Sequence, residues 1–284
     1  MFDAGFWGGR EVLRVSDGFI GVFDSGAGGI SVLKNLVSEL PQEQFLFFGD
    51  SANAPYGDKD PTSILFFSRR IVDTLLGKGA KAIVIACNTA TSAALPSLCE
   101  AFPGIPVQGV IKPGAKAAVR ATKQGCIAVL ATEATIQGGA YQRAIAELDP
   151  AARVVGRACT LFVPLAEEGW MEGEVVEGVC RRYVGDLFEG ERRPDTVLLG
   201  CTHFPLLKGA LARVVGPGVS LVDSAQTTAE AVDEYLAAAG LATPSKERGS
   251  VRFMATDNTA RFARTGSLFL GRELKEEEVE LVDI

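Results

Sequence analysis

Short apolar runs alternate along the chain with longer stretches that have a helical period. The runs predicted as strands are Phe19–Phe23, Gln44–Phe48, Ala82–Ala86, Val107–Ile111, Cys126–Leu130, Arg153–Gly156, Thr196–Leu199, Ser220–Val222 and Val251–Ala255. Most are apolar at successive positions, which is typical of parallel strands covered by helices on both faces. Between them, apolar side chains recur at the spacing of one helix face, as at Ile64, Phe67, Ile71 and Leu75. The pattern predicts an α/β fold with right-handed crossovers.

Two strand ends resemble one another. Val84-Ile-Ala-Cys-Asn-Thr and Leu198-Leu-Gly-Cys-Thr-His both run from an apolar strand through a small residue into Cys and two polar residues. They predict two similar doubly wound units with mostly parallel sheets, which share one cleft at the carboxyl ends of their strands. We place the first α/β domain at residues 19–113 plus 223–284 and the second at 114–222. The break is expected near Lys112-Pro113-Gly114, and residues 1–18 are expected to be an N-terminal extension.

Composition and charge exclude several classes of protein. Of the 284 residues, 47% are hydrophobic and 22% are charged, and the net charge is −7. An acidic globular chain without a basic run is not expected to bind nucleic acid or a membrane surface. The N-terminal segment lacks the basic start and apolar stretch of a secretory signal, so a cytoplasmic location is expected. The six cysteines include no C-x-x-C pair and His203 is the only histidine, so no metal site is predicted.

Two of the cysteines stand where reactive thiols are expected. Cys87 and Cys201 each follow a predicted strand and precede a predicted helix, whose first N–H groups are expected to stabilise a thiolate and lower its pKa. His203 lies two positions after Cys201, so a Cys–His nucleophile pair is an alternative to two thiols acting together. The remaining cysteines lack the polar residues that follow these two and are predicted to be inert; they are Cys99, Cys126, Cys159 and Cys180.

Two further turns after strands carry candidate binding groups. The segment 24–29 is rich in glycine but matches neither the dinucleotide fingerprint nor the Walker A loop. Its backbone N–H groups can hold a small anion such as a carboxylate, and Asp24 can bind an ammonium group or receive a proton. The segment 50–57 is polar, and Tyr56 and Gly57 can offer a side chain and a backbone N–H to a ligand.

Four segments form a set: Asp24-Ser-Gly-Ala-Gly-Gly-Ile-Ser31, Asp50-Ser-Ala-Asn-Ala-Pro-Tyr-Gly57, Ala86-Cys-Asn-Thr-Ala-Thr91 and Gly200-Cys-Thr-His-Phe-Pro-Leu-Leu207. In their order and spacing they resemble glutamate racemase, of the aspartate/glutamate racemase family, from about Phe19 to Phe269. The resemblance implies a two-domain α/β isomerase that interconverts L- and D-glutamate without pyridoxal phosphate or metal. It also implies a supply of D-glutamate for peptidoglycan synthesis, and a homodimer.

The resemblance assigns roles to individual residues. Cys87 and Cys201 are expected to transfer protons, with Cys87 acting on D-glutamate and Cys201 on L-glutamate. Asp24 and His203 are expected to assist Cys87 and Cys201, respectively. The expected substrate contacts are Asp24, Ser25, Tyr56, Gly57, Asn88, Thr89, Thr202 and His203, and the expected auxiliary acidic residues are Asp50 and Glu167. Asn53 and Phe204 depart from the family, which often has Arg and Tyr at these positions.

Two thiols suit racemisation, because one face of the α-carbon loses a proton while the opposite face receives one. A thiolate accepts on one side, a thiol donates on the other, and hydrogen-bond donors around the α-carboxylate stabilise the carbanion between them. Three alternatives remain. They are the same chemistry on aspartate or a hydantoin, a Cys–His hydrolase or transferase with a covalent acyl intermediate, and a binding module for small carboxylates.

Overall fold

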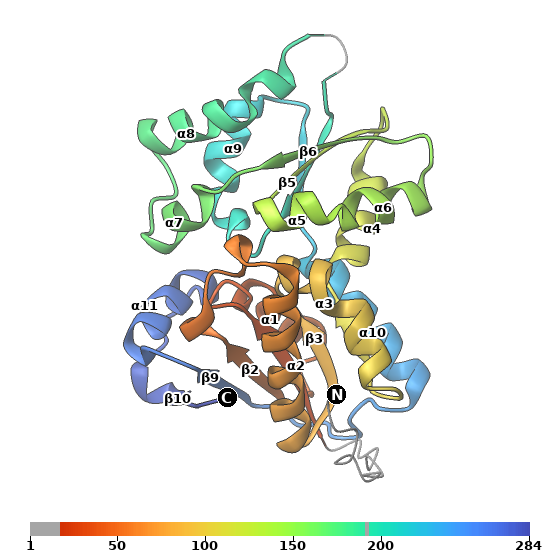
Figure 1. The fold of residues 1–284 in the computed structure, drawn as a ribbon, viewed down its shortest axis with the longest axis vertical. Coiled ribbons are helices and arrows are strands. Elements are labelled where there is room, and N and C mark those ends of the chain that lie inside the picture. Colours follow the sequence, from red (N-terminus) through yellow and green to blue (C-terminus); the bar gives the residue numbers. More distant parts are fainter. Residues whose placement is uncertain (1–17, 191–192) are drawn as a thin grey trace.

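The computed structural model describes residues 18–190 and 193–284, which form an α/β fold with two parallel sheets (Figure 1). The first sheet has the strand order β10-β9-β2-β1-β3-β4, and the second has the order β6-β5-β7-β8. The strands are β1 (Phe19–Asp24), β2 (Phe45–Gly49), β3 (Ala80–Ile85), β4 (Val107–Gly109), β5 (Cys126–Ala131), β6 (Arg153–Ala158), β7 (Thr196–Gly200), β8 (Ser220–Val222), β9 (Val251–Ala255) and β10 (Val279–Leu281). The predicted fold class is confirmed.

Helices make most of the connections between the strands. They are α1 (Ile30–Glu39), α2 (Pro61–Gly77), α3 (Asn88–Ala101), α4 (Ile111–Ala121), α5 (Glu133–Gly138), α6 (Ala140–Leu148), α7 (Phe162–Glu167), α8 (Glu174–Val184), α9 (Lys208–Val215), α10 (Ala225–Ala239) and α11 (Thr259–Leu270). Short 3₁₀ segments are η1 (Ser51–Asn53), η2 (Tyr56–Asp58), η3 (Gly185–Phe188), η4 (Phe204–Leu207) and η5 (Glu276–Glu278). No helix in the described part of the chain is long and apolar enough to cross a membrane.

The two sheets repeat one topology. In each, the second strand pairs on one side of the first, and the chain then crosses to the other side for the third and fourth strands, which gives β2-β1-β3-β4 and β6-β5-β7-β8. The point where the winding direction changes is where ligands bind in open parallel sheets. Cys87 follows β3 and Cys201 follows β7, so the two thiols occupy equivalent places at the two switch points. The similarity of the two strand ends therefore reflects two similar units.

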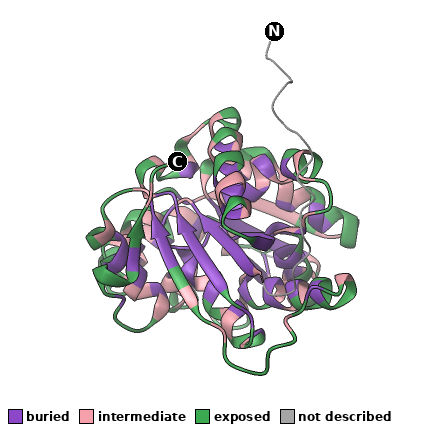
Figure 2. Cartoon of the chain, turned by 90° about the horizontal axis from the view of Figure 1, so that it is seen from below, coloured by how far each residue is buried: buried purple, intermediate pink, exposed green. Residues whose placement is uncertain are grey.

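Both faces of the first sheet are covered by helices, so its central strands are buried throughout (Figure 2). Successive side chains of β1 point to opposite faces, as the pleat of a strand requires. Ile20 and Val22 join a core with α1 and α10, whereas Phe19 and Phe23 join a second core with α2 and α3. The near-continuous apolar runs in the sequence follow from this double coverage.

Three features differ from the sequence prediction. The edge strand β10 was missed because only Val279 in its three residues is buried, which leaves no apolar run to read. The run Val107–Ile111 ends as a strand at Gly109, because Ile111 already begins α4. The residues Lys112-Pro113-Gly114, which suggested a break between domains, lie in the first turn of α4, where proline is tolerated. The domain bounds themselves stay a prediction, and residues 1–17 of the expected extension lie outside the described residues.

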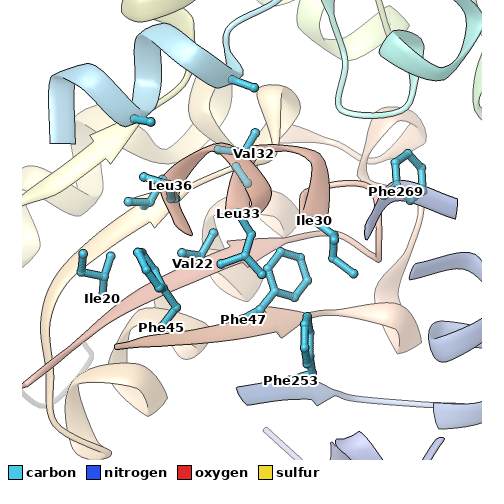
Figure 3. Packing of buried hydrophobic residues seen from close by; sticks show 14 of the residues in the cluster. Ile20, Val22, Ile30, Val32, Leu33, Leu36, Phe45, Phe47, Phe253 and Phe269 are labelled. Carbon is cyan, nitrogen blue, oxygen red and sulfur yellow. The ribbon is translucent and has the colours of Figure 1, made fainter. Parts of the chain in front are cut away.

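The C-terminal elements β9, β10 and α11 return to the first sheet (Figure 1). Phe47 of β2 anchors them: its ring centroid lies 6.3 Å from that of Phe253 on β9 and 6.1 Å from that of Phe262 on α11. Figure 3 shows Phe47 between Ile30 of α1 and Phe253. Because α11 borders the cavity described below, this aromatic cluster fixes one wall of the site.

We expect Phe47→Ala to lower the free energy of unfolding by about 3–5 kcal/mol, because it removes a fully buried ring and leaves a cavity. The matched control is Phe66→Ala, whose ring is 55% exposed and whose loss should change stability by roughly 0.5 kcal/mol or less. Urea unfolding of both variants checks this. Equal destabilisation by the two substitutions would contradict the assigned core.

Candidate active site

A cavity of about 430 Å³ lies between the two sheets and receives strand ends from both. Cys87 from the first sheet and Cys201 from the second both line it. The other predicted site residues that line it are Ser25, Tyr56, Gly57, Asn88, Thr89, Glu167, Thr202 and His203. Asp24 and Asp50 are fully buried behind the wall and do not line the cavity. The topology thus brings ten residues from five separate segments of the chain to one place.

Cys87 is the N-cap residue of α3. Its sulfur accepts a hydrogen bond from the Ala90 N–H over 3.4 Å, and its thiol donates to Ser25 Oγ over 3.9 Å. The helix was expected to lower the pKa of this thiol, and the Ala90 N–H acts in that direction, but the net shift is the opposite. Burial raises the pKa of Cys87 well above its usual range, the Asp24 carboxylate raises it further, and the Ala90 N–H offsets only part of this. Cys87 is therefore a neutral thiol at rest.

Asp24 lies beneath the glycine-rich loop. Its Oδ2 accepts the Gly29 N–H over 3.0 Å and the Gly26 N–H over 3.3 Å, so two N–H groups expected to hold a small anion already bind this carboxylate. Its Oδ1 is buried and has no hydrogen-bond partner in the described chain. Burial raises the pKa of Asp24, and the nearby His203 lowers it in part. This carboxyl group can therefore hold a proton close to Cys87.

Asp50 organises the polar loop that follows β2. Its Oδ2 accepts a hydrogen bond from Tyr56 Oη over 2.5 Å, and its Oδ1 accepts from Asn53 Nδ2 over 3.0 Å and from Thr256 Oγ1 over 2.9 Å. Burial and the adjacent carboxylate raise the pKa of Tyr56, so the phenol stays protonated. Asp50 therefore holds Tyr56 against the cavity, and Asn53, which departs from the family pattern, helps to hold Asp50.

Cys201 has a different setting. Its sulfur lies 3.8 Å from Nδ1 of His203, and Nε2 of His203 lies 3.2 Å from Oε1 of Glu167. Arg261 donates to the other carboxylate oxygen of Glu167 over 3.1 Å. Burial disfavours the imidazolium, but hydrogen bonds with Cys201 and Glu167 outweigh it and raise the pKa of His203 to about 10. A cation thus stands beside Cys201, whereas a carboxylate stands near Cys87.

Glu167 is the ionised carboxylate that pairs with both His203 and Arg261. The hydrogen bond from His203 lowers the pKa of Glu167 and outweighs the effect of burial, and Arg261 lowers it further. The adjacent Glu168 is exposed and takes no part in these hydrogen bonds. Glu167 therefore fixes the orientation and charge of the histidine.

Several wall residues were missed by the sequence analysis. Thr132 directly follows β5, as Ser25 directly follows β1, and its position after an apolar run is the signal that could have found it. Its hydroxyl lies 2.9 Å from that of Thr89 and 3.0 Å from that of Thr135. Arg261 gave no signal, because its contact with Glu167 joins α11 and α7 from opposite sides of the cavity. In the described residues, no group of three or more His, Cys, Asp or Glu side chains is placed to hold a metal ion.

Comparison with known proteins finds relatives over nearly the whole chain. The family described as Asp/Glu/Hydantoin racemase matches residues 20–232. The glutamate racemase of Geobacter metallireducens is 46% identical over 255 residues, which are 90% of this chain and 93% of the relative. Two solved structures are similar at 34% identity over 95% of this chain. They are a glutamate racemase isoform from Bacillus anthracis, with a TM-score of 0.88 and 99% of that chain covered, and the glutamate racemase from Francisella tularensis in complex with D-glutamate, with a TM-score of 0.86 and 98% covered.

The single histidine makes the charge beside Cys201 directly measurable. We expect the imidazole C–H resonances of His203 to titrate near pH 10 in the folded protein, against about 6.5 in the unfolded chain. Because folding raises this pKa, the stabilisation linked to the imidazolium is complete below about pH 6.5 and is lost as the pH rises towards 10. Glu167→Gln should lower the pKa of His203, and Glu168→Gln should leave it unchanged. A folded-state midpoint near 6.5 would contradict the charge assignment.

Proposed function

Because this chain belongs to the Asp/Glu/hydantoin racemase family and racemises glutamate, we propose that Cys87 and Cys201 carry the two proton transfers, one on each face of the α-carbon. The observation that supports this most is that both thiols line one cavity from equivalent switch points of the two sheets. A small amino acid held between them exposes opposite faces to the two sulfurs. The reaction supplies D-glutamate for peptidoglycan, and the proposed mechanism uses only side chains of the chain itself.

The two sulfurs differ in the charge beside them. His203 places a positive charge 3.8 Å from Cys201, whereas burial and Asp24 keep Cys87 a neutral thiol. The proposed cycle starts with Cys201 as the thiolate. The Cys201 thiolate removes the α-proton of L-glutamate, and the Cys87 thiol delivers its proton to the opposite face. After one turnover Cys201 is a thiol and Cys87 a thiolate, which is the state that removes the α-proton of D-glutamate. Asp24 and His203 assist the proton movements that restore the first state.

The base strength of a thiolate is far too low to deprotonate an amino acid unaided. A free thiol has a pKa of about 8.5, so the site must also stabilise the carbanion. Hydroxyl and amide groups of Ser25, Asn88, Thr89 and Thr202 line the cavity and can donate to the substrate carboxylates as negative charge develops. Excluding water from this place strengthens each such hydrogen bond.

The alternatives account for less of the site. A Cys–His hydrolase would use Cys201 and His203 but would leave Cys87 without a role in the same cavity. Aspartate or a hydantoin in place of glutamate would use the same two thiols, and the glutamate racemases among the relatives favour glutamate. A homodimer rests on the family resemblance alone and stands as part of this proposal, as does the cytoplasmic location expected from the sequence.

We expect Cys87→Ser and Cys201→Ser each to slow racemisation by about 10²–10⁴-fold, because each removes one of the two proton-transfer groups. The assay follows loss of chirality and α-deuterium uptake by NMR, with L- or D-glutamate in deuterated water and no added cofactor. Cys99→Ser, at an exposed cysteine outside the cavity, should keep the wild-type rate. Racemisation at the wild-type rate by either cavity variant would refute the two-thiol mechanism. An acyl adduct on Cys201 in mass spectra would favour the hydrolase instead.

A second test concerns the contact between the two units. Gly28 follows β1, and a Cβ atom at this position would lie 2.5 Å from Thr202 Oγ1 and 2.6 Å from His203 Cε1. Gly28→Ala therefore has to push Thr202 and His203 away from the first sheet. We expect kcat/KM to fall about tenfold or more, as small misplacements of catalytic groups do, with little change in melting temperature.

The matched control is Gly77→Ala at the end of α2, where an added Cβ meets nothing within 4 Å. Steady-state kinetics and thermal unfolding of both variants check the prediction. Wild-type kinetics for Gly28→Ala would show that the two units need not approach this closely during catalysis.

A further inference from the structure

Tyr141 is a buried titratable residue to which the proposed mechanism gives no role. It belongs to α6 in the second unit and is completely buried. Its Oη lies 2.6 Å from Oδ1 of Asn88, which is the first residue of α3 in the first unit. Asn88 lines the cavity directly after Cys87. A side chain from one unit thus holds a cavity-lining amide of the other.

The direction of this hydrogen bond is settled by the surroundings of the phenol. Burial raises the pKa of Tyr141 beyond its usual range, so the phenol keeps its proton. Ser224 makes a hydrogen bond with the phenol as well, and this lowers the pKa only in part. The one phenolic proton goes to the Asn88 carbonyl oxygen, since that oxygen can only accept. The NH₂ group of Asn88 is then the end of the amide left for the cavity.

The position of Tyr141 is fixed on three sides. A Cβ atom at Gly114 would lie 3.0 Å from Tyr141 Oη and 3.2 Å from Ser224 Cβ, so α4 and the start of α10 meet at the phenol. These are the two places where the chain passes between the sheets. A Cβ atom at Gly200 would lie 2.9 Å from Tyr141 Cε2, and Gly200 directly precedes Cys201. The ring therefore packs between the chain crossings and the strand end that carries the second thiol.

We propose that Tyr141 is a positioning residue for the racemisation. It holds the Asn88 amide so that Nδ2 donates to a substrate carboxylate while charge builds up during removal of the α-proton. This inference rests on the proposed function, because it takes Asn88 as a substrate contact. The Tyr141 phenol packs where the chain passes between the two units. At this place it keeps the Asn88 amide in one orientation.

The test is a double-mutant cycle with Tyr141→Phe, which keeps the ring and removes only the hydroxyl. We expect Tyr141→Phe to lower kcat for glutamate about tenfold, because the Asn88 amide loses the hydrogen bond that holds its orientation, with a smaller change in KM. In the Asn88→Ala background the same substitution should lower kcat no further, because its effect passes through the amide. The matched control is Tyr235→Phe on α10, whose side chain is 46% exposed and lies outside the cavity.

Each outcome decides the proposal. A wild-type kcat for Tyr141→Phe, or an equal loss of kcat in both backgrounds, would overturn the positioning role and leave the two-thiol mechanism intact. A wild-type kcat for Asn88→Ala would overturn the positioning role together with the proposed Asn88 contact. Thermal unfolding of each variant identifies any that fails to fold, and Asn88→Asp then takes the place of Asn88→Ala in the cycle, since the carboxylate still accepts from Tyr141 but offers no NH₂ group.

Discussion

The cost of taking ionisable groups out of water governs this site. Two thiols, a histidine and two aspartates are all buried around one cavity, and each charged form has to be offset by a partner or given up. At Cys87 burial raises the pKa of the thiol most and the nearby Asp24 carboxylate raises it further, so the thiol stays neutral. At Cys201 the neighbour is an imidazolium held by Glu167. The two similar strand ends thus meet opposite charges in what packs around them.

Much of the fold followed from the sequence because the determining interactions are local or periodic. Apolar runs of the right length predicted nine of the ten strands, and the polar residues after Cys87 and Cys201 separated these two thiols from the other cysteines. The strand β10 was missed since one buried residue gives no pattern. Lys112-Pro113-Gly114 read as a turn, although these residues lie in the first turn of α4, where proline is tolerated.

The charge states could not be predicted in the same way. A helix N-terminus favours a thiolate by a modest amount, and the sequence cannot show that burial and Asp24 outweigh it at Cys87. Arg261, Glu167 and His203 are far apart in the chain and meet only through the packing of α11 and α7. The Asp24–Gly29 loop looked like an anion site, but its anion is the carboxylate of Asp24 itself. Burial and long-range packing decide the first two of these cases, whereas the third depends on two local hydrogen bonds.

The effect of the unlike surroundings of the two sulfurs has a limit set by thermodynamics. L- and D-glutamate are mirror images with equal free energies in water, so their equilibrium constant is one for any catalyst. The site can bind or convert one enantiomer differently from the other, but kcat/KM must remain equal in the two directions. The unlike neighbours of Cys87 and Cys201 therefore cannot enrich the D form. A net flow towards it has to come from whichever reaction consumes D-glutamate next.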